Sequence, residues 1–167
     1  GTVSVSESGE TITLIGNRWI AIDYPYSITT DSVMEFDFKS TITGEIHGIG
    51  LDTDLALDEG SAFNLHGTQQ FGIENFNYTT QGNVQHFVIP LGEYLSGNAQ
   101  YLFFAMDHDV SSPNATSIFS NIMIYEKPAS APVITSNPSS TGIIGTPYQY
   151  DADYTVDVNS QLPVTFS

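Results

Sequence analysis

Short runs of β-branched and aromatic residues, each ended by Gly, Asn, Asp or Pro, dominate this sequence. Runs of this kind are typical of β-strands closed by turns. Eight strands are predicted, at Thr11–Ile15, Arg18–Ile22, Val33–Lys39, Glu45–Leu51, Ala62–Leu65, Val84–Ile89, Gln100–Met106 and Ile118–Tyr125. No window keeps apolar residues at helical spacing for three turns, so the pattern predicts an all-β fold, an antiparallel β-sandwich or jelly roll.

Three of these runs also predict how their side chains are distributed. In 33–39 the apolar residues Met34, Phe36 and Phe38 alternate with charged ones, which indicates a half-buried strand. The run 101–106 is apolar on both faces, which is typical of a central strand between two layers. In the last run, one apolar face is predicted from Ile118, Ser120, Ile122 and Ile124, opposite Phe119, Asn121, Met123 and Tyr125.

The charge balance excludes some partners. The 167 residues include 19 acidic and only 3 basic side chains, which gives a net charge of −16, and no cysteine. Three basic side chains cannot neutralise a useful number of phosphates. We therefore expect neither a nucleic acid nor an anionic membrane surface as a partner. No apolar run approaches the roughly 20 residues that a membrane span needs. The acidity has two interpretations that both stay open: a solubilising surface, or carboxylates gathered around a cation.

The composition changes near residue 126. The segment Lys127-Pro-Ala-Ser-Ala-Pro132 is typical of an extended linker. We therefore predict a β-sandwich domain at 1–126, a Pro-rich linker at 127–131 and a second β segment at 132–167. The absence of cysteine fits either the cytosol or a secreted bacterial protein.

Two pairs of aspartates are candidate metal ligands, Asp52 with Asp54 and Asp107 with Asp109. Each pair closes an apolar strand, and hard cations such as Ca²⁺ prefer oxygen ligands from flexible loops. The spacing is not that of an EF-hand, so such a site must be assembled from separated loops. Ordinary turn chemistry is the alternative, because Asp is common at strand ends. His47, His86 and His108 lack the spacing of a zinc site.

The strand with Glu35 and Asp37 is the best sign of an enzyme. Laminarinase-like hydrolases on jelly rolls carry a strand Glu-x-Asp-x-x-Glu, and retaining cleavage needs two carboxyl groups about 5 Å apart. Here the place of the second Glu falls at Lys39 or Ser40. A nucleophile without its acid is not a hydrolase, and no Gly-x-Ser-x-Gly motif is present either.

Aromatic residues in turn-rich segments are candidate sugar platforms. The sequence places Trp19, Tyr24, Tyr26, Phe71, Phe76 and Tyr78 there. An exposed ring can stack on a pyranose face while neighbouring Asn, Gln and Asp side chains bind hydroxyl groups. The competing interpretation is a place in the core, which is where most aromatic side chains lie.

Several ordered motifs resemble one family. They are Asn17-Arg-Trp19, Met34-Glu-Phe-Asp-Phe38, Gly44-Glu-Ile-His-Gly-Ile-Gly50, Gly67-Thr-Gln69, Ile89-Pro-Leu-Gly92 and Met106-Asp-His-Asp109. Together, residues 1–126 resemble the Ca²⁺-assisted jelly-roll carbohydrate-binding modules of secreted bacterial polysaccharide-degrading enzymes. The tail, with Pro132-Val-Ile-Thr-Ser-Asn-Pro138 and Gly145-Thr-Pro-Tyr-Gln-Tyr150, resembles the start of a bacterial Ig-like domain. At 36 residues it is expected to be only the first part of one.

The resemblance implies non-catalytic binding of a polysaccharide that targets a catalytic domain in the same parent chain, secreted from a bacterium. Asp52, Asp54, Asp107 and Asp109 are then expected to hold Ca²⁺. Trp19, His47, Gln69, Phe71 and His108 are expected to meet the glycan. A cell-surface adhesin or structural module is the alternative function, and a glycoside hydrolase is the third.

Overall fold

The computed structural model describes residues 1–56 and 58–127. Nine β-strands and two short 3-10 helices account for the regular structure of these residues. The strands are β1 (Thr2–Val5), β2 (Thr11–Ile15), β3 (Arg18–Ile28), β4 (Ser32–Lys39), β5 (Ile46–Asp52), β6 (Ala62–His66), β7 (Gln85–Ile89), β8 (Gly97–Asp107) and β9 (Thr116–Glu126). The 3-10 helices are η1 (Glu59–Ser61) and η2 (Leu91–Glu93).

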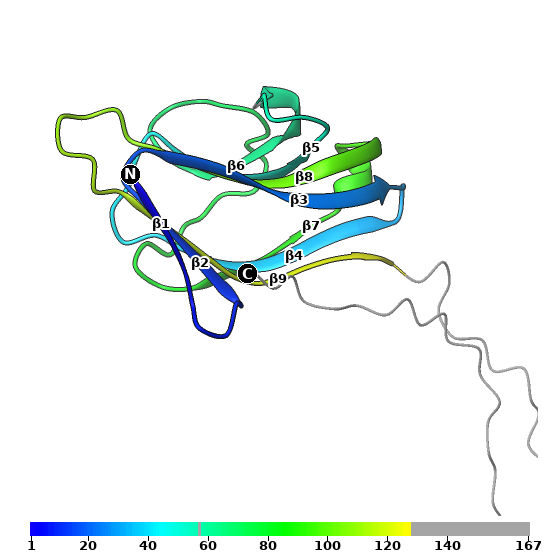
Figure 1. Cartoon of the computed structure of the whole chain (residues 1–167), viewed down its shortest axis with the longest axis horizontal. Helices are drawn as coiled ribbons and strands as arrows, with labels where there is room; N and C mark the ends of the chain where they lie inside the picture. The colour runs from blue at the N-terminus through cyan, green and yellow to red at the C-terminus, as the bar shows by residue number, and fades with distance from the viewer. Residues whose placement is uncertain (57, 128–167) are drawn as a thin grey trace, which may run out of the picture.

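The strands form two antiparallel sheets that pack face to face, as Figure 1 shows. The first sheet has the order β1-β2-β9-β4-β7, and the second has the order β3-β8-β5-β6. Apart from the pairs β1-β2 and β5-β6, which stay within one sheet, consecutive strands alternate between the sheets, as is common in jelly rolls. The predicted all-β sandwich is confirmed.

A cluster of phenylalanine rings fills the space between the sheets. Phe38 lies 4.9 Å from Phe119 between ring centroids, and Phe104 of the second sheet lies 5.1 Å from the same Phe119. All three side chains are fully buried. Contacts of this kind add about 0.5–1.5 kcal/mol per pair beyond the burial of apolar area. The inward positions of β4 are those that the alternation in 33–39 predicts.

All eight predicted strands are present, and β8 lies between β3 and β5 as its apolar sequence indicates. The strand β1 was not predicted, because all four of its residues are exposed and no buried face marks it. The strand β3 runs further than predicted, through a bulge between Asp23 and Tyr26. Tyr24 and Tyr26 consequently belong to a strand, where they pack against the core.

The prediction for the faces of β9 is wrong in its first half. Ser117 and Phe119 point into the core, and the inward positions then become Ile122 and Ile124. The register against β4 shifts between Glu35 and Asp37, and Asn121 on the opposite strand has a φ of 54°. A bulge adds one residue to the strand and so reverses which face the following side chains occupy. Asn tolerates this left-handed conformation better than most residues.

The predicted Ig-like segment 132–167 and most of the linker lie outside the described residues and stay predictions. The strand β9 ends at Glu126, at the boundary that the composition indicates. In the part of the chain that the structure describes, no helix has the length and apolar character required to cross a membrane.

Candidate functional site

The outer face of the sheet β3-β8-β5-β6 carries an aromatic pair. Ile20 and Ile22 of β3 pack against the core, so the alternate residues Trp19 and Ala21 lie on the opposite, outer face. Phe71 reaches Trp19 from the long connection between β6 and β7, and the two rings meet edge to face with centroids 5.6 Å apart. Both side chains keep part of their surface exposed. Two of the predicted platform residues are therefore neighbours.

A hydrogen bond fixes the loop at Phe71. The backbone N–H of Phe71 donates to Glu74 Oε1 at 3.1 Å. Further along the same loop, the N–H of Ile73 donates to the carbonyl of Ala62 at 2.7 Å, and the N–H of Asn64 donates to the carbonyl of Ile73 at 2.9 Å. The loop is thus tied to the edge strand β6, which holds the Phe71 ring in place beside Trp19.

Small residues lie beside Trp19 on the same sheet face. The pairing register sets Trp19 opposite Ala105, Ala105 opposite Gly48, and Gly48 opposite Asn64. This row crosses all four strands of the sheet. Ala105 and Gly48 are buried although they lie on the outer face. Their small size leaves room for larger side chains above the middle of the sheet.

A cavity of about 230 Å³ opens next to Trp19. Its lining residues come from β3, β8 and the loop after β5, and they are Trp19, Ile20, Ala21, Asp52, Asp54, Leu55, Ala56, Phe103 and Phe104. The ring of Phe103 covers Gly50, where an added Cβ would lie 2.6 Å from the ring. The cavity therefore has an apolar, partly aromatic wall and two carboxylates at one end, the mixture that small-molecule sites commonly show.

Asp52 shapes the loop at this end of the cavity. It is almost fully buried, and it accepts hydrogen bonds from the Thr53 N–H at 2.7 Å and the Ser61 hydroxyl at 2.8 Å. Asp54 is exposed and accepts one from the Ala56 N–H at 2.7 Å. These bonds are the turn chemistry that was the alternative interpretation of this pair.

The structure does not bring the four predicted aspartate ligands together. Strands β5 and β8 are antiparallel neighbours, with Asp52 opposite Tyr101 and Ile46 opposite Asp107. Each aspartate pair begins at the last residue of its own strand, so the two pairs lie at opposite ends of the sheet, about 20 Å apart along six residues. The prediction of one site from both pairs is therefore wrong.

Asp107 and Asp109 instead join a residue that the sequence did not single out. Glu45, Asp107 and Asp109 each offer an oxygen atom, and these atoms lie within 4.8 Å of one another. The side-chain amide of Asn17 donates to Asp109 Oδ1. Burial raises the pKa of Asp107, and the charges of Asp109 and Glu45 raise it further. The pairing of β5 with β8 creates this cluster, and it lies toward the Trp19 end of the sheet.

His47 is a core residue, which corrects its prediction as a glycan contact. Its ring is fully buried between the sheets. The Gly44 N–H donates to Nε2 at 2.7 Å, and Nδ1 lies 2.8 Å from the Ser117 hydroxyl. Burial lowers the pKa of His47 to about 3, and the neighbouring His66 and His108 add to this. The ring has no surface that a glycan could reach.

Gln69 and His108 lie nearer the surface. Gln69 is exposed, and its backbone N–H donates to the Glu45 carbonyl at 2.9 Å. His108 is half-buried, and its Nδ1 accepts the N–H groups of Asn114 and Ala115 at 3.2 and 3.1 Å. His108 thus braces the loop between β8 and β9. Gln69 borders a second, polar cavity, and its side chain is accessible there.

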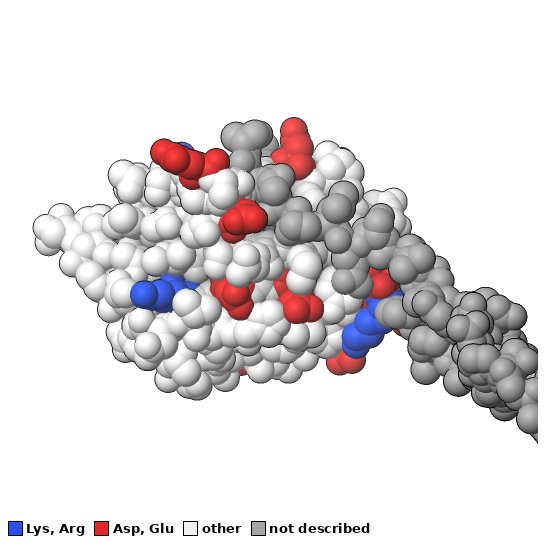
Figure 2. All heavy atoms as spheres, turned by 90° about the horizontal axis from the view of Figure 1, so that it is seen from below, with Lys and Arg blue, Asp and Glu red and all other residues white. Residues whose placement is uncertain are grey.

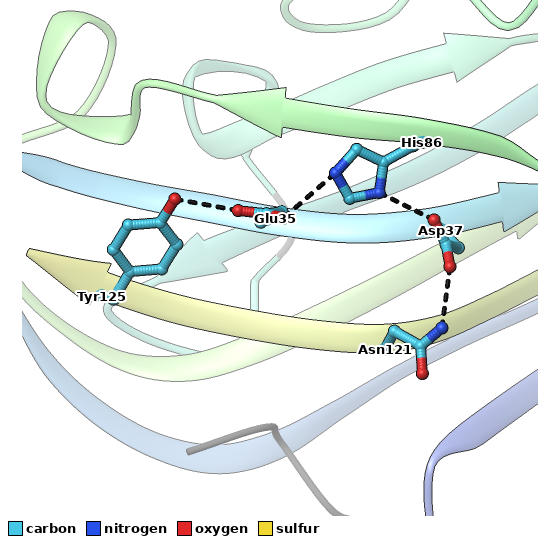
Figure 3. Close-up of polar contacts among 5 residues, drawn as sticks. All are labelled: Glu35, Asp37, His86, Asn121 and Tyr125. Carbon is cyan, nitrogen blue, oxygen red and sulfur yellow. Dashed lines mark hydrogen bonds and ion pairs between the residues drawn. The ribbon is translucent and has the colours of Figure 1, made fainter. Parts of the chain in front are cut away.

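The carboxylates Glu35 and Asp37 form a closed network on the other sheet, shown in Figure 3. His86 of β7 lies between them, with Nε2 3.1 Å from Glu35 Oε1 and Nδ1 2.8 Å from Asp37 Oδ1. Tyr125 donates to Glu35 Oε2 at 2.8 Å, and Asn121 donates to Asp37 Oδ2 at 2.7 Å. Each of the four carboxylate oxygens therefore already has a partner.

Acidic side chains lie singly over the face on which this network lies. Figure 2, seen from below the sandwich of Figure 1, shows several separate acidic groups on the visible part of this face, with a few basic side chains and many uncharged residues between them. The net charge of −16 is thus not gathered into one patch on this face. That distribution is the one expected of a solubilising surface.

Comparisons with known proteins give one distant likeness. No protein-family model matches the chain, and no curated protein sequence matches it significantly. Among solved structures, it is similar to the family 30 carbohydrate-binding module of the cellulosomal cellulase Cel9D-Cel44B of Clostridium thermocellum. The match has a TM-score of 0.37 and 18% identity, and it covers 70% of this chain and 75% of that one. A likeness this distant does not assign a function.

Proposed function

We propose that this chain binds a polysaccharide, without cleaving it, in the cavity beside Trp19 and Phe71. The observation that carries the proposal is the partly exposed ring of Trp19, which lines the cavity and meets the ring of Phe71 edge to face. An aromatic wall favours the C–H-rich face of a pyranose ring, because this contact removes apolar surface of both partners from water. Asp54 at the far end can accept hydrogen bonds from sugar hydroxyls.

A non-catalytic role agrees with the state of the carboxylates Glu35 and Asp37. Each of their oxygens is held by His86, Tyr125 or Asn121, and none of these five residues lines the cavity beside Trp19 or the polar cavity beside Gln69. Hydrolysis needs a free acid and a nucleophile on either side of a bound glycosidic link. Binding would then serve a catalytic domain elsewhere in a secreted bacterial chain. A neutral glycan is favoured, since the net charge of −16 repels anionic polymers.

Binding of purified protein to a glycan array tests the proposal, followed by calorimetry on the best glycan. Trp19→Ala should weaken binding at least tenfold, because truncation of a central aromatic anchor costs about 2 kcal/mol or more. Tyr125→Ala is the matched control, since Tyr125 is a partly exposed aromatic on the opposite sheet. Equal affinity of the two variants would contradict the proposed site. Capture of cell-wall or protein partners with no glycan binding would favour the adhesin alternative.

We also propose that Glu45, Asp107 and Asp109 hold Ca²⁺, in place of the four aspartates. Three carboxylates from two segments, one before β5 and one at the end of β8, fit the oxygen-rich coordination that this ion prefers. Burial, and then the charges of Asp109 and Glu45, raise the pKa of Asp107, and a bound cation would offset both effects. The cluster also adjoins the aromatic pair, since Asp107 follows Ala105 by two residues on the same strand.

A thermal melt with Ca²⁺ and then with EDTA tests this metal site. A ligand at a hundredfold excess over Kd adds about 2.7 kcal/mol of stability, which raises the melting temperature by several degrees. Asp109→Asn should abolish the rise, whereas Asp54→Asn, at the other end of the sheet, should keep it. If Ca²⁺ leaves the melting temperature of the wild-type protein unchanged, the three carboxylates are part of the acidic surface and do not form a metal site.

A further inference from the structure

A second cavity, of about 170 Å³, lies beside the edge strand β6 and differs in character from the first. Its lining contains polar side chains and glycine alone: Asn64, His66, Gly67, Thr68, Gln69, Gln70, Glu74 and Asn77. Six of these eight residues come from the connection between β6 and β7. The same connection carries Phe71, whose ring contacts Trp19 at the first cavity.

Asn64 lies at the base of this polar cavity, where hydrogen bonds hold its side chain in place. It is 6% exposed, and its Oδ1 accepts the His47 N–H at 3.3 Å. Its amide nitrogen donates to the Gln69 carbonyl at 3.1 Å and to Glu74 Oε1 at 3.4 Å. Glu74 Oε1 also holds the Phe71 N–H, at 3.1 Å. One carboxylate thus ties the wall of the polar cavity to the loop that holds the Phe71 ring against Trp19.

The front of the polar cavity carries amide groups without partners. Gln69, Gln70 and Asn77 are exposed, and their side-chain amides make no hydrogen bond to any residue that the structure describes. An amide offers both a donor and an acceptor, and Glu74 adds an acceptor. Neighbouring sugar hydroxyls, which both donate and accept, match this set. An anion would meet a carboxylate and neither Lys nor Arg, and an apolar group would meet no apolar wall.

The two cavities are close enough for one oligosaccharide to reach both. Trp19 and Asn64 stand at the two ends of a single row across the sheet, separated by three strand spacings, or about 14 Å. The aromatic cavity suits the stacked rings of a main chain. The polar cavity suits a sugar bound through its hydroxyl groups, as a side branch is when it leaves that main chain.

We infer that the polar cavity is a second subsite, which takes a branch sugar of a decorated neutral polysaccharide. This inference rests on the proposed function, since the main chain must lie along Trp19 and Phe71. Gln70 and Asn77 bind the hydroxyls of the branch, while Asn64 and Glu74 hold the loop. The protein would then select a branched polymer over its linear counterpart.

Calorimetry with matched pairs of glycans tests the inference. The probes are linear β-glucan, mannan and xylan oligosaccharides, each beside a counterpart of equal main-chain length that carries one branch sugar. The wild-type protein should bind the branched member of one pair about tenfold more tightly. The double variant Gln70→Ala with Asn77→Ala should lose this preference and keep its affinity for the linear member. Asn98→Ala, an exposed amide on β8, is the matched control.

The outcomes separate the two proposals. Equal binding of linear and branched glycans by the wild type, or a preference that survives in the double variant, overturns the subsite and leaves the proposed function standing. Trp19→Ala should weaken both members of the pair alike. A wild-type protein that binds none of these glycans overturns the proposed function and the subsite together. A thermal melt of the double variant checks that the loss of preference does not come from unfolding, and Gln70→Glu offers a milder second variant.

Discussion

Acidification should destabilise this domain through one buried ring, that of His47. The Gly44 N–H donates to Nε2 at 2.7 Å, so the neutral ring carries its proton on Nδ1 and donates it to the Ser117 hydroxyl at 2.8 Å. That hydroxyl in turn donates to the Met106 sulfur at 3.1 Å. The chain is complete only while the ring is neutral. A second proton would face the Gly44 N–H, on a ring that is fully buried.

The size of the effect follows from the pKa of His47, which burial lowers from 6.5 to about 3. A depressed histidine pKa leaves stability unaffected at pH 7, where the ring is neutral in both states. Below pH 6.5 the unfolded chain binds the proton first, so stability falls by about 1.4 kcal/mol per pH unit. At pH 4 the loss attributable to His47 should be about 3 kcal/mol.

Urea unfolding of the wild type and of His47→Gln at pH 7 and pH 4 isolates this loss. Gln keeps a donor and an acceptor but cannot be protonated in this range. The acidic side chains that titrate near pH 4 are common to both proteins, so they cancel when the two pH changes are compared. The wild type should lose about 3 kcal/mol more than the variant between the two pH values.

Equal losses of unfolding free energy between pH 7 and pH 4 in the wild type and in His47→Gln would contradict this prediction. Imidazole NMR gives an independent check that does not depend on the variant's fold. The His47 signals should stay at their neutral positions down to about pH 4, while the exposed His86 titrates well above that. A His47 ring that titrates near 6.5 in the folded protein would refute the burial argument directly.

Three further predictions concern the core, the loop and the opposite sheet. Phe38→Ala should cost about 3–5 kcal/mol in urea unfolding, since the ring is fully buried. Gly67→Ala should weaken glycan binding, because the φ of Gly67 is 139° and an added Cβ would lie 2.1 Å from the Glu45 carbonyl oxygen. Gly82→Ala is the control and should leave binding unchanged, because Gly82 also has a positive φ, of 83°, but has open space around its Cβ position. Asp37 and Glu35 raise the pKa of His86, so the charged ring stabilises the folded protein below pH 6.5. His86→Ala should therefore lower the melting temperature below pH 6.5, and the difference from the wild type should disappear as the pH rises through the raised pKa of His86.

Local pattern was enough to predict the strands and most of their faces. A strand with one buried face alternates apolar and polar residues, as 33–39 does, and a strand with two buried faces is apolar throughout, as 101–106 is. In both cases the residues of the strand itself carry the pattern. The bulge at Asn121 could not be predicted in the same way. Its extra residue is visible only against the partner strand β4, because the local sequence continues to alternate plausibly through it.

The site was only partly predictable, for a similar reason. Trp19 and Phe71 were chosen one at a time, and their contact depends on how the connection between β6 and β7 returns across the sheet. The error over the four aspartates was avoidable. Once 45–51 and 100–106 are taken as antiparallel neighbours, the residues that follow them must lie at opposite ends. Glu45 is the first residue of the predicted strand 45–51, and the start of that strand is where an antiparallel partner of Asp107 has to lie.

The two outer faces of the sandwich differ in whether their polar groups are already satisfied. On the face of β4, β7 and β9, the carboxylates and the histidine bond to one another, so a ligand would have to replace existing hydrogen bonds at a cost of about 1–3 kcal/mol for each group left unpaired. On the face of β3, β8, β5 and β6, the rings of Trp19 and Phe71 stay partly exposed, and the amides of Gln69, Gln70 and Asn77 have no partner among the described residues. A ligand gains contacts there without breaking any. Recognition is therefore expected on the second sheet, although the first carries the residues that most resemble catalytic ones.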